Sequence, residues 1–297
     1  IRVSSAGICG TDLAIAKGYM GFSGVPGHEF AGIVEKCGDE EWVGKRVAGE
    51  INIGCGVCSY CFKGRQNHCP SRSVLGILKK DGAFAEYITL PTRNLHIVPD
   101  AVSDDEAVFI EPLAAAFEIT SQVNIRPEDK VCVLGDGRLG LLIGQVVSLT
   151  GCDLIVAGKW AEKLDVIKKM GIKTEMSSAL GAREFDYVIE CSGSKDGLKR
   201  ACGLVMPGGA VILKTTSAES GAFDLNRVVI DEISIVGSRC GPFTPAIRSL
   251  ERKMINVTSL ISGIFPIEDG VEAFKFASNK GSLKAIIKVN HAIHKNV

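Results

Sequence analysis

The chain has 297 residues, of which 46% are hydrophobic, enough for the buried core of one large domain or two ordinary ones. Basic and acidic residues balance, so the formal net charge is zero and no electrostatic signature of nucleic acid or anionic membrane binding is present. No apolar run is long enough to span a bilayer. We therefore expect no nucleic-acid partner and no membrane partner.

The first third is predicted to contain mostly antiparallel strands. Alternating apolar residues indicate strands at Phe30 to Val34, Val43 to Ala48 and Tyr87 to Leu90, separated by polar turns. Ile1 to Ser4 alternate in the same way, and Ile1 is not a start methionine. We expect the sequence to begin partway into a domain, with any targeting segment lying upstream.

Four cysteines lie close together at Cys55, Cys58, Cys61 and Cys69, with spacings of 3, 3 and 8 residues. This spacing predicts a closed four-thiolate zinc site of the structural type, in a turn-rich lobe over residues 54–70. Metal binding would supply the folding energy of a lobe without its own core. One alternative is that the four cysteines are free or disulfide-bonded. Another is a nucleic-acid zinc ribbon, which is weakened because this sequence has no basic recognition helix.

Seven further cysteines are scattered along the chain, and several of them, such as Cys132, Cys191 and Cys202, lie in apolar runs. Isolated thiols in such runs are typical of buried core residues in a reducing compartment. The cysteine content therefore favours a cytoplasmic location.

A dinucleotide fingerprint follows a short apolar run at Val131 to Leu134. Gly135, Gly137 and Gly140 fit G-x-G-x-x-G with Asp136, Arg138 and Leu139 between them, and an apolar helical run, Leu141 to Leu149, comes next. This strand, turn and helix would place a pyrophosphate at a helix N-terminus. A purely structural glycine-rich turn is the alternative.

Strands and helices then alternate in a pattern that predicts a doubly wound parallel sheet of about six strands. The expected strands are Lys130 to Leu134, Leu154 to Ala157, a weak Lys173 to Met176, Asp186 to Glu190, Ala210 to Leu213 and Ile233 to Val236; the expected helices are Val108 to Thr120, Ala161 to Met170 and Leu198 to Val205. Cys191 would lie at the carboxyl end of a strand, where such sheets bind ligands. Arg239 could reach the pyrophosphate or ribose of a dinucleotide, or it could pair with a carboxylate.

The residues after the second predicted strand bear on the choice of nicotinamide cofactor. An acid about twenty residues beyond the fingerprint would select NAD, whereas this chain has Gly158 and Lys159 there and Lys163 one helical turn later. The two lysines could attract a 2′-phosphate, so NADP(H) is expected over NAD(H). The alternative is that Lys159 is only a solvated surface lysine and that either cofactor is accepted.

The tail is predicted to form two helices and a strand, at Thr244 to Asn256, Pro266 to Ser278 and Leu283 to Val289. His291 and His294 lie in a polar terminus and are expected to be solvated.

Five motifs in order carry a resemblance to a known family: Gly7 to Asp12, Gly27 to Glu29, the four-cysteine lobe, Glu111 to Leu113 and the fingerprint. The chain resembles the zinc-containing medium-chain dehydrogenase/reductase (alcohol dehydrogenase-like) superfamily, nearest to the polyol, threonine and glucose dehydrogenases. The resemblance implies an α/β fold with a Rossmann domain over residues 113–240. It also implies a mostly β GroES-like catalytic domain over residues 1–112, to which residues 241–297 return, and a homodimer or homotetramer.

The resemblance further implies a catalytic zinc held by Cys9 and His28, with Glu29 or Glu111 completing the ligands directly or through water. Asp12 would orient the His28 imidazole, and Thr11 would pass a proton from the substrate oxygen. Taken separately, these residues could be a core thiol, a core histidine and surface carboxylates. Ala14 replaces a histidine found in many relatives, which argues against a threonine dehydrogenase.

Together, these features predict a zinc-dependent oxidoreductase that transfers a hydride between an alcohol, polyol or sugar, or the matching carbonyl, and NAD(P). The alternatives are a zinc-independent quinone or enoyl reductase of the same fold, or a non-catalytic nucleotide-sensing protein.

Overall fold

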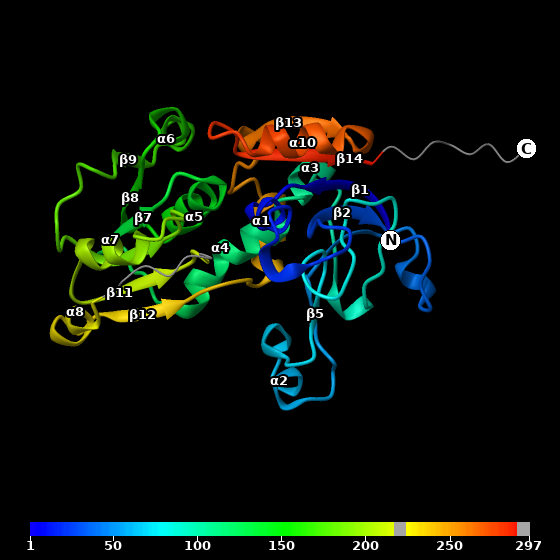
Figure 1. Ribbon diagram of the computed structural model, residues 1–297, viewed down its shortest axis with the longest axis horizontal. Coiled ribbons are helices and arrows are strands. Elements are labelled where there is room, and N and C mark those ends of the chain that lie inside the picture. Colours follow the sequence, from blue (N-terminus) through cyan, green and yellow to red (C-terminus); the bar gives the residue numbers. More distant parts are fainter. Residues whose placement is uncertain (217–223, 290–297) are drawn as a thin grey trace, which may run out of the picture. The chain divides into compact units, whose positions relative to one another are not determined.

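The computed structural model describes residues 1–216 and 224–289 (Figure 1). The chain forms two compact units, the first made of Ile1–Glu111 with the segment from Phe243 onward, and the second of Pro112–Pro242. Helix α4 (Ile110–Gln122) begins in the first unit and continues into the second. The predicted helix over this region therefore exists, displaced by two residues.

The first unit contains a six-stranded mixed sheet with the order β13-β14-β1-β2-β3-β6. Its strands are β1 (Arg2–Gly7), β2 (Glu29–Ile33), β3 (Arg46–Gly49), β6 (Leu95–Ile97), β13 (Ile261–Pro266) and β14 (Lys284–Lys288). Strand β14 pairs antiparallel with β1 and parallel with β13. The end of the chain therefore completes the sheet that its beginning starts, and the expected discontinuous fold class is confirmed.

Short helices accompany this sheet in the first unit. They are α1 (Gly10–Ile15), α3 (Asp104–Ala107), α9 (Phe243–Glu251) and α10 (Gly270–Ala277). Helix α10 covers β13 and β14, where Ala273 and Ala277 pack with Ile8 and Ile287 (Figure 1).

The cysteine lobe lies between the short strands β4 (Asn52–Ile53) and β5 (Ser73–Val74) and contains one turn of helix, α2 (Ser59–Phe62). In Figure 1 this segment extends away from β1 and β2 of the same unit. Its larger apolar side chains face solvent: Val57 is 74% exposed and Phe62 78% exposed. The lobe thus has little apolar burial to stabilise it.

The second unit contains a parallel sheet with the order β12-β11-β10-β7-β8-β9. Its strands are β7 (Lys130–Leu134), β8 (Asp153–Gly158), β9 (Lys173–Met176), β10 (Phe185–Glu190), β11 (Val205–Leu213) and β12 (Ser234–Gly237); its further helices are α5 (Arg138–Ser148), α6 (Ala161–Lys168), α7 (Gly197–Leu204) and α8 (Leu225–Ile230). The central strands contain runs of buried apolar residues because both faces of the sheet are covered, as at Val133 and Ile189. The doubly wound prediction is confirmed.

Some predicted elements were wrong in detail. Tyr87 to Leu90 contributes only an isolated bridge from Tyr87 to Arg2, and β13 was missed because Gly263 and Pro266 interrupt its pattern. Helix α9 ends at Glu251, and α10 begins only at Gly270 after a 3₁₀ turn. His291 and His294 lie outside the described residues. Among the residues that are described, no helix has the length and hydropathy of a membrane-spanning segment.

Candidate metal centres and nucleotide site

Cys9, His28 and Glu29 form one cluster of possible metal ligands in the first unit, with their ligand atoms all within 4.8 Å of one another. Cys9 follows β1 and caps α1, whereas His28 and Glu29 lie at the start of β2. Antiparallel pairing places Gly7 opposite Glu29, so the register of two strands brings together residues nineteen and twenty positions apart.

Asp12 ties this cluster together from a fully buried position. Its Oδ2 accepts a 2.7 Å hydrogen bond from the Cys9 backbone N–H, and its Oδ1 accepts one of 3.1 Å from the Gly27 N–H. Oδ1 also lies 3.2 Å from Nδ1 of His28. Burial alone would raise the pKa of Asp12, but the His28 charge and these backbone donors outweigh it and lower that pKa. Asp12 therefore fixes the imidazole with Nε2 as the nitrogen left for a metal.

The electrostatics of the cluster suit a cation. Burial would lower the pKa of His28, but the charges of Asp12 and Cys9 outweigh it and hold that pKa well above its ordinary value. The site thus concentrates negative charge beside an imidazole, and a divalent ion would replace the proton there. The Thr11 hydroxyl lies 3.8 Å from the Cys9 sulfur, at the edge of the same cluster.

Sequence reasoning missed Lys284, which is completely buried and forms an ion pair with Glu29. Lys284 is on β14, two strands from Glu29, and the pair crosses over β1 at Gly7, where a Cβ would lie 2.7 Å from Glu29 Oε2. Its ammonium also lies 5.3 Å from the ring centroid of Phe109. Within the described residues, the other Glu29 oxygen, Oε1, is buried without a hydrogen-bond partner. The signal in the sequence that could have revealed this pair is a lysine within the mostly apolar last predicted strand.

Glu111 does not join the cluster of Cys9, His28 and Glu29. Glu111 lies in the first turn of α4. Among the described residues, its carboxylate is not within 4.8 Å of all three ligand atoms of that cluster. Glu29 is thus the carboxylate that this cluster contains, and the choice between the two carboxylates as the zinc ligand stays a prediction.

The four lobe cysteines form the second cluster, and their sulfurs also lie within 4.8 Å of one another. A backbone N–H from Val57 lowers the pKa of Cys55 to about 6. Although the Gly56 N–H favours the Cys61 thiolate, burial and the neighbouring sulfurs raise its pKa to about 11. All four sulfurs cannot ionise together without a cation, so this donor set fits zinc.

The fingerprint glycines take the positions that a phosphate-binding turn requires. Gly135 follows β7 with φ +146°, and a Cβ there would lie 2.7 Å from the Cys191 carbonyl oxygen. Gly137 is the N-cap of α5 with open space before it, and Gly140 packs against the Gly135 carbonyl. Arg138 and Leu139 are the first two residues of α5. The α5 N-terminus can thus accept an anion.

The other predicted nucleotide-site residues lie at the carboxyl edge of the same sheet. Gly158 ends β8 and is buried, Lys159 is exposed, and Lys163 is half-buried in α6. Cys191 follows β10, and burial raises the pKa of its thiol well above the ordinary range, so it is no nucleophile. Arg239 follows β12 and is exposed.

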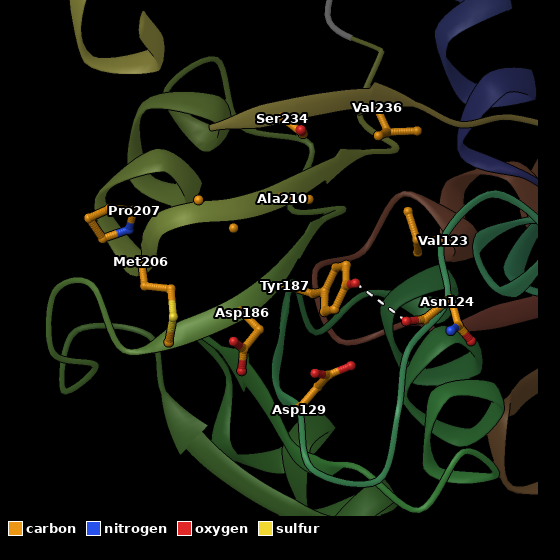
Figure 2. Close-up of a pocket in the computed structure, with 12 residues that line it drawn as sticks. Val123, Asn124, Asp129, Asp186, Tyr187, Met206, Pro207, Ala210, Ser234 and Val236 are labelled. Atoms are coloured by element: carbon orange, nitrogen blue, oxygen red, sulfur yellow. Dashed lines mark hydrogen bonds between the residues drawn. The ribbon is translucent and has the colours of Figure 1, made fainter. Parts of the chain in front are cut away.

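A pocket of about 460 Å³ lies elsewhere in the second unit, at the amino ends of β10, β11 and β12 (Figure 2). Its carboxylates serve the local backbone: Asp129 accepts from the Arg126 N–H, and Asp186 accepts from the Lys130 N–H. The Tyr187 hydroxyl donates to the Asn124 carbonyl. Because parallel sheets bind nucleotides at the carboxyl ends of their strands, this pocket is not the dinucleotide site.

Comparison with known proteins identifies the family. Residues 1–100 match the alcohol dehydrogenase GroES-like domain, and residues 139–256 match the zinc-binding dehydrogenase family. The chain is 30% identical to sorbitol dehydrogenase from Halalkalibacterium halodurans, over 97% of this chain and 90% of that protein. It is 31% identical to the starvation-sensing protein RspB of Escherichia coli, over 92% and 86%.

Solved structures agree with this assignment. An rspB alcohol dehydrogenase from Escherichia coli, complexed with NADH, matches with a TM-score of 0.90 and 30% identity, covering 97% of this chain and 90% of that one. A zinc-binding dehydrogenase from Sinorhizobium meliloti bound to NADP matches with a TM-score of 0.88 and 28% identity, with the same coverage. The chain therefore belongs to the zinc-containing medium-chain dehydrogenase/reductase superfamily and is an alcohol dehydrogenase-like oxidoreductase.

Proposed function

We propose that the protein catalyses reversible hydride transfer between an alcohol carbon of a polyol or sugar-type substrate and NAD(P). The single observation that carries this proposal is the convergence of Cys9, His28 and Glu29 on one point. The names of the relatives support the substrate class, since they include a sorbitol dehydrogenase and D-xylulose reductases.

Cys9 and His28 supply two ligands of a catalytic zinc, and Glu29 supplies the carboxylate. Glu111 is the alternative carboxylate, because Lys284 already balances the charge of Glu29. Cys55, Cys58, Cys61 and Cys69 hold a structural zinc. When bound, the catalytic ion polarises the substrate oxygen, and the nicotinamide accepts the hydride.

The residues around the cluster hold the geometry and move the proton. Asp12 fixes the Cys9 backbone and the His28 ring, which keeps both ligands in place during turnover. The Thr11 hydroxyl takes the proton of the substrate oxygen and passes it outward; its distance of 3.8 Å from Cys9 Sγ supports this role. Ala14 cannot end such a relay, so the proton leaves through water or a ribose hydroxyl.

The fingerprint Gly135 to Gly140 and Arg138 at the start of α5 bind the pyrophosphate. Cys191 and Arg239 lie beside that site at the carboxyl edge of the sheet. Lys159 and Lys163 are the residues that favour NADP(H), and the choice between the two cofactors depends on the whole turn between β8 and α6.

We further propose that the protein is located in the cytoplasm and forms a homodimer or homotetramer. All eleven cysteines lie within the described residues as free thiols, which suits a reducing compartment. Sedimentation of the purified protein measures the number of subunits.

The test is a panel of alcohols, polyols and sugars assayed with NAD⁺ and NADP⁺, together with zinc content by mass spectrometry. We expect polyol oxidation and about two zinc ions per chain. Alcohol oxidation that survives complete zinc removal, or reduction of enones or quinones alone, would overturn the proposal.

A further inference from the structure

Asp136, between the first two fingerprint glycines, contacts the turn that follows β8 rather than its own loop. Its Oδ2 accepts hydrogen bonds from the backbone N–H groups of Lys159, at 2.6 Å, and Trp160, at 2.7 Å. These donors lie at the carboxyl end of the second strand, where a Rossmann sheet binds the adenosine ribose. A carboxylate therefore does lie at this subsite, although no acid ends β8.

The space for this side chain depends on Gly158. A Cβ at Gly158 would overlap the Cβ and carboxylate of Asp136. The glycine at the usual acid position and the aspartate in the fingerprint are thus two parts of one arrangement. An aspartate from the first turn has taken the place that an acidic residue at the end of β8 would fill.

We propose that Asp136 is the specificity-determining residue for the adenosine ribose and selects NAD(H) against NADP(H). The inference rests on the proposed nicotinamide-dependent function. Among the described residues no donor reaches Oδ1, so this oxygen can accept from the ribose hydroxyls. A 2′-phosphate would meet a negative charge there.

Two features decide between this carboxylate and the nearby cations. The backbone N–H groups of Lys159 and Trp160 would be good phosphate donors, but Asp136 already uses both. Lys159 is exposed, so solvent and salt screen its attraction for a phosphate, whereas two hydrogen bonds hold the carboxylate in place. The fixed carboxylate therefore outweighs Lys159, one of the two lysines on which the sequence-based expectation of NADP(H) relied.

The test measures binding rather than turnover. Dissociation constants of NADH and NADPH are obtained by fluorescence, and those of 5′-ADP and 2′,5′-ADP by calorimetry, for the wild type and for Asp136→Asn. The asparagine keeps an oxygen acceptor for the two N–H groups and removes the charge. We expect the wild type to bind NADH at least about tenfold tighter than NADPH, and Asp136→Asn to reduce that ratio about tenfold or more.

Lys159→Gln is the matched control, because it changes a charge at the same turn without touching the carboxylate. It should alter the NADH to NADPH ratio much less than Asp136→Asn does. Asp136→Ser removes the same charge with a shorter side chain and replaces the asparagine variant should that one fail to fold.

Equal or tighter binding of NADPH by the wild type, or a ratio unchanged in Asp136→Asn, would overturn the role of Asp136. Failure of all four nucleotides to bind would overturn the proposed function as well. Selective NADH binding without alcohol oxidation would contradict the proposed function alone and would support the role of Asp136.

Discussion

The two candidate metal centres of the first unit are built in opposite ways. The lobe draws its four sulfurs from fifteen consecutive residues, Cys55 to Cys69, and leaves Val57 and Phe62 in solvent. The other cluster draws Cys9 from the turn after β1, His28 from just before β2 and Glu29 from β2, with Lys284 of β14 beside them, all buried or half-buried.

The difference concerns what holds each site when no ion is bound. In the lobe, the neighbouring sulfurs disfavour one another's ionisation and little apolar surface is buried, so we expect the proposed zinc to stabilise the local fold. In the buried cluster, Asp12 and Lys284 already compensate His28 and Glu29. We infer that the lobe uses its ion to fold, whereas the buried cluster is preformed and uses its ion for chemistry. Three experiments can break or sharpen this contrast, and a fourth measures an ion pair that lies outside both centres.

Cys9→Ser should have the largest effect. Loss of a ligand to the ion that stabilises the alkoxide should lower kcat/KM about 10³-fold or more, while zinc content falls from about two to about one per chain. The unfolding midpoint should change little. Cys37→Ser, a cysteine outside both clusters, is the control. Unchanged alcohol oxidation in Cys9→Ser would remove the chemical role of this centre.

Lys284→Met should destabilise the zinc-free protein by about 3–5 kcal/mol, because Glu29 is left buried and unpaired. Zinc should recover part of that loss by supplying a positive charge. Urea unfolding with and without chelator measures both values. Lys288→Met is the control on the same strand, because the Lys288 side chain also forms an ion pair, with Asp105, but is 32% exposed. Equal losses in the two variants would show that burial of the pair contributes nothing.

Cys61→Ser should release the structural zinc and expose residues 54–70 to protease, while the circular dichroism of the rest of the protein persists. The local response is expected because the lobe buries little apolar surface, although hydrogen bonds such as Arg93 to the Gly54 carbonyl and Gln66 to the Glu50 carboxylate, each 2.9 Å, connect it to the rest of the unit. Limited proteolysis with mass mapping gives the readout, with Cys152→Ser as control. Cooperative loss of the whole fold would contradict a lobe that melts alone.

Glu106→Gln should have the smallest effect, about 1 kcal/mol at pH 7. Partial burial alone would raise the pKa of Glu106, but hydrogen bonds from Lys253 and Ser103 outweigh it and lower that pKa. Because the folded pKa is depressed, the contribution is complete above the unfolded pKa, about 4.3, and is lost as pH falls through the folded value. Wild type and variant should thus converge in stability in acid; a constant difference would exclude the ion pair as its cause.

Sequence alone could predict features that depend on near neighbours. The lobe follows from the Cys55 to Cys69 spacing, and the phosphate turn follows from Gly135 to Gly140 between a strand and a helix. Cys9 and His28 could be grouped only through a family resemblance, because the β1–β2 register that joins them leaves no mark in residue spacing.

What sequence could not reach depends on contacts between distant segments. Lys284 looked like one more residue of a terminal strand, since its burial follows from β14 pairing beside β1. Asp136 looked like a variable fingerprint position, because only the folded loop shows it bonded to Lys159 and Trp160. In both cases the contacts of a charged side chain can be seen only in the folded chain.

The position of β14 also bears on biosynthesis. The second unit is encoded entirely within residues 112–242, so it can emerge from the ribosome and fold while the first sheet still lacks its closing strand. Until Lys284 arrives, β1 has an open edge and the nascent chain carries Glu29 without its counter-charge. The complete sheet of the metal-binding unit therefore forms only after β14 has been made, although Cys9, His28 and Glu29 precede the whole second unit in the chain.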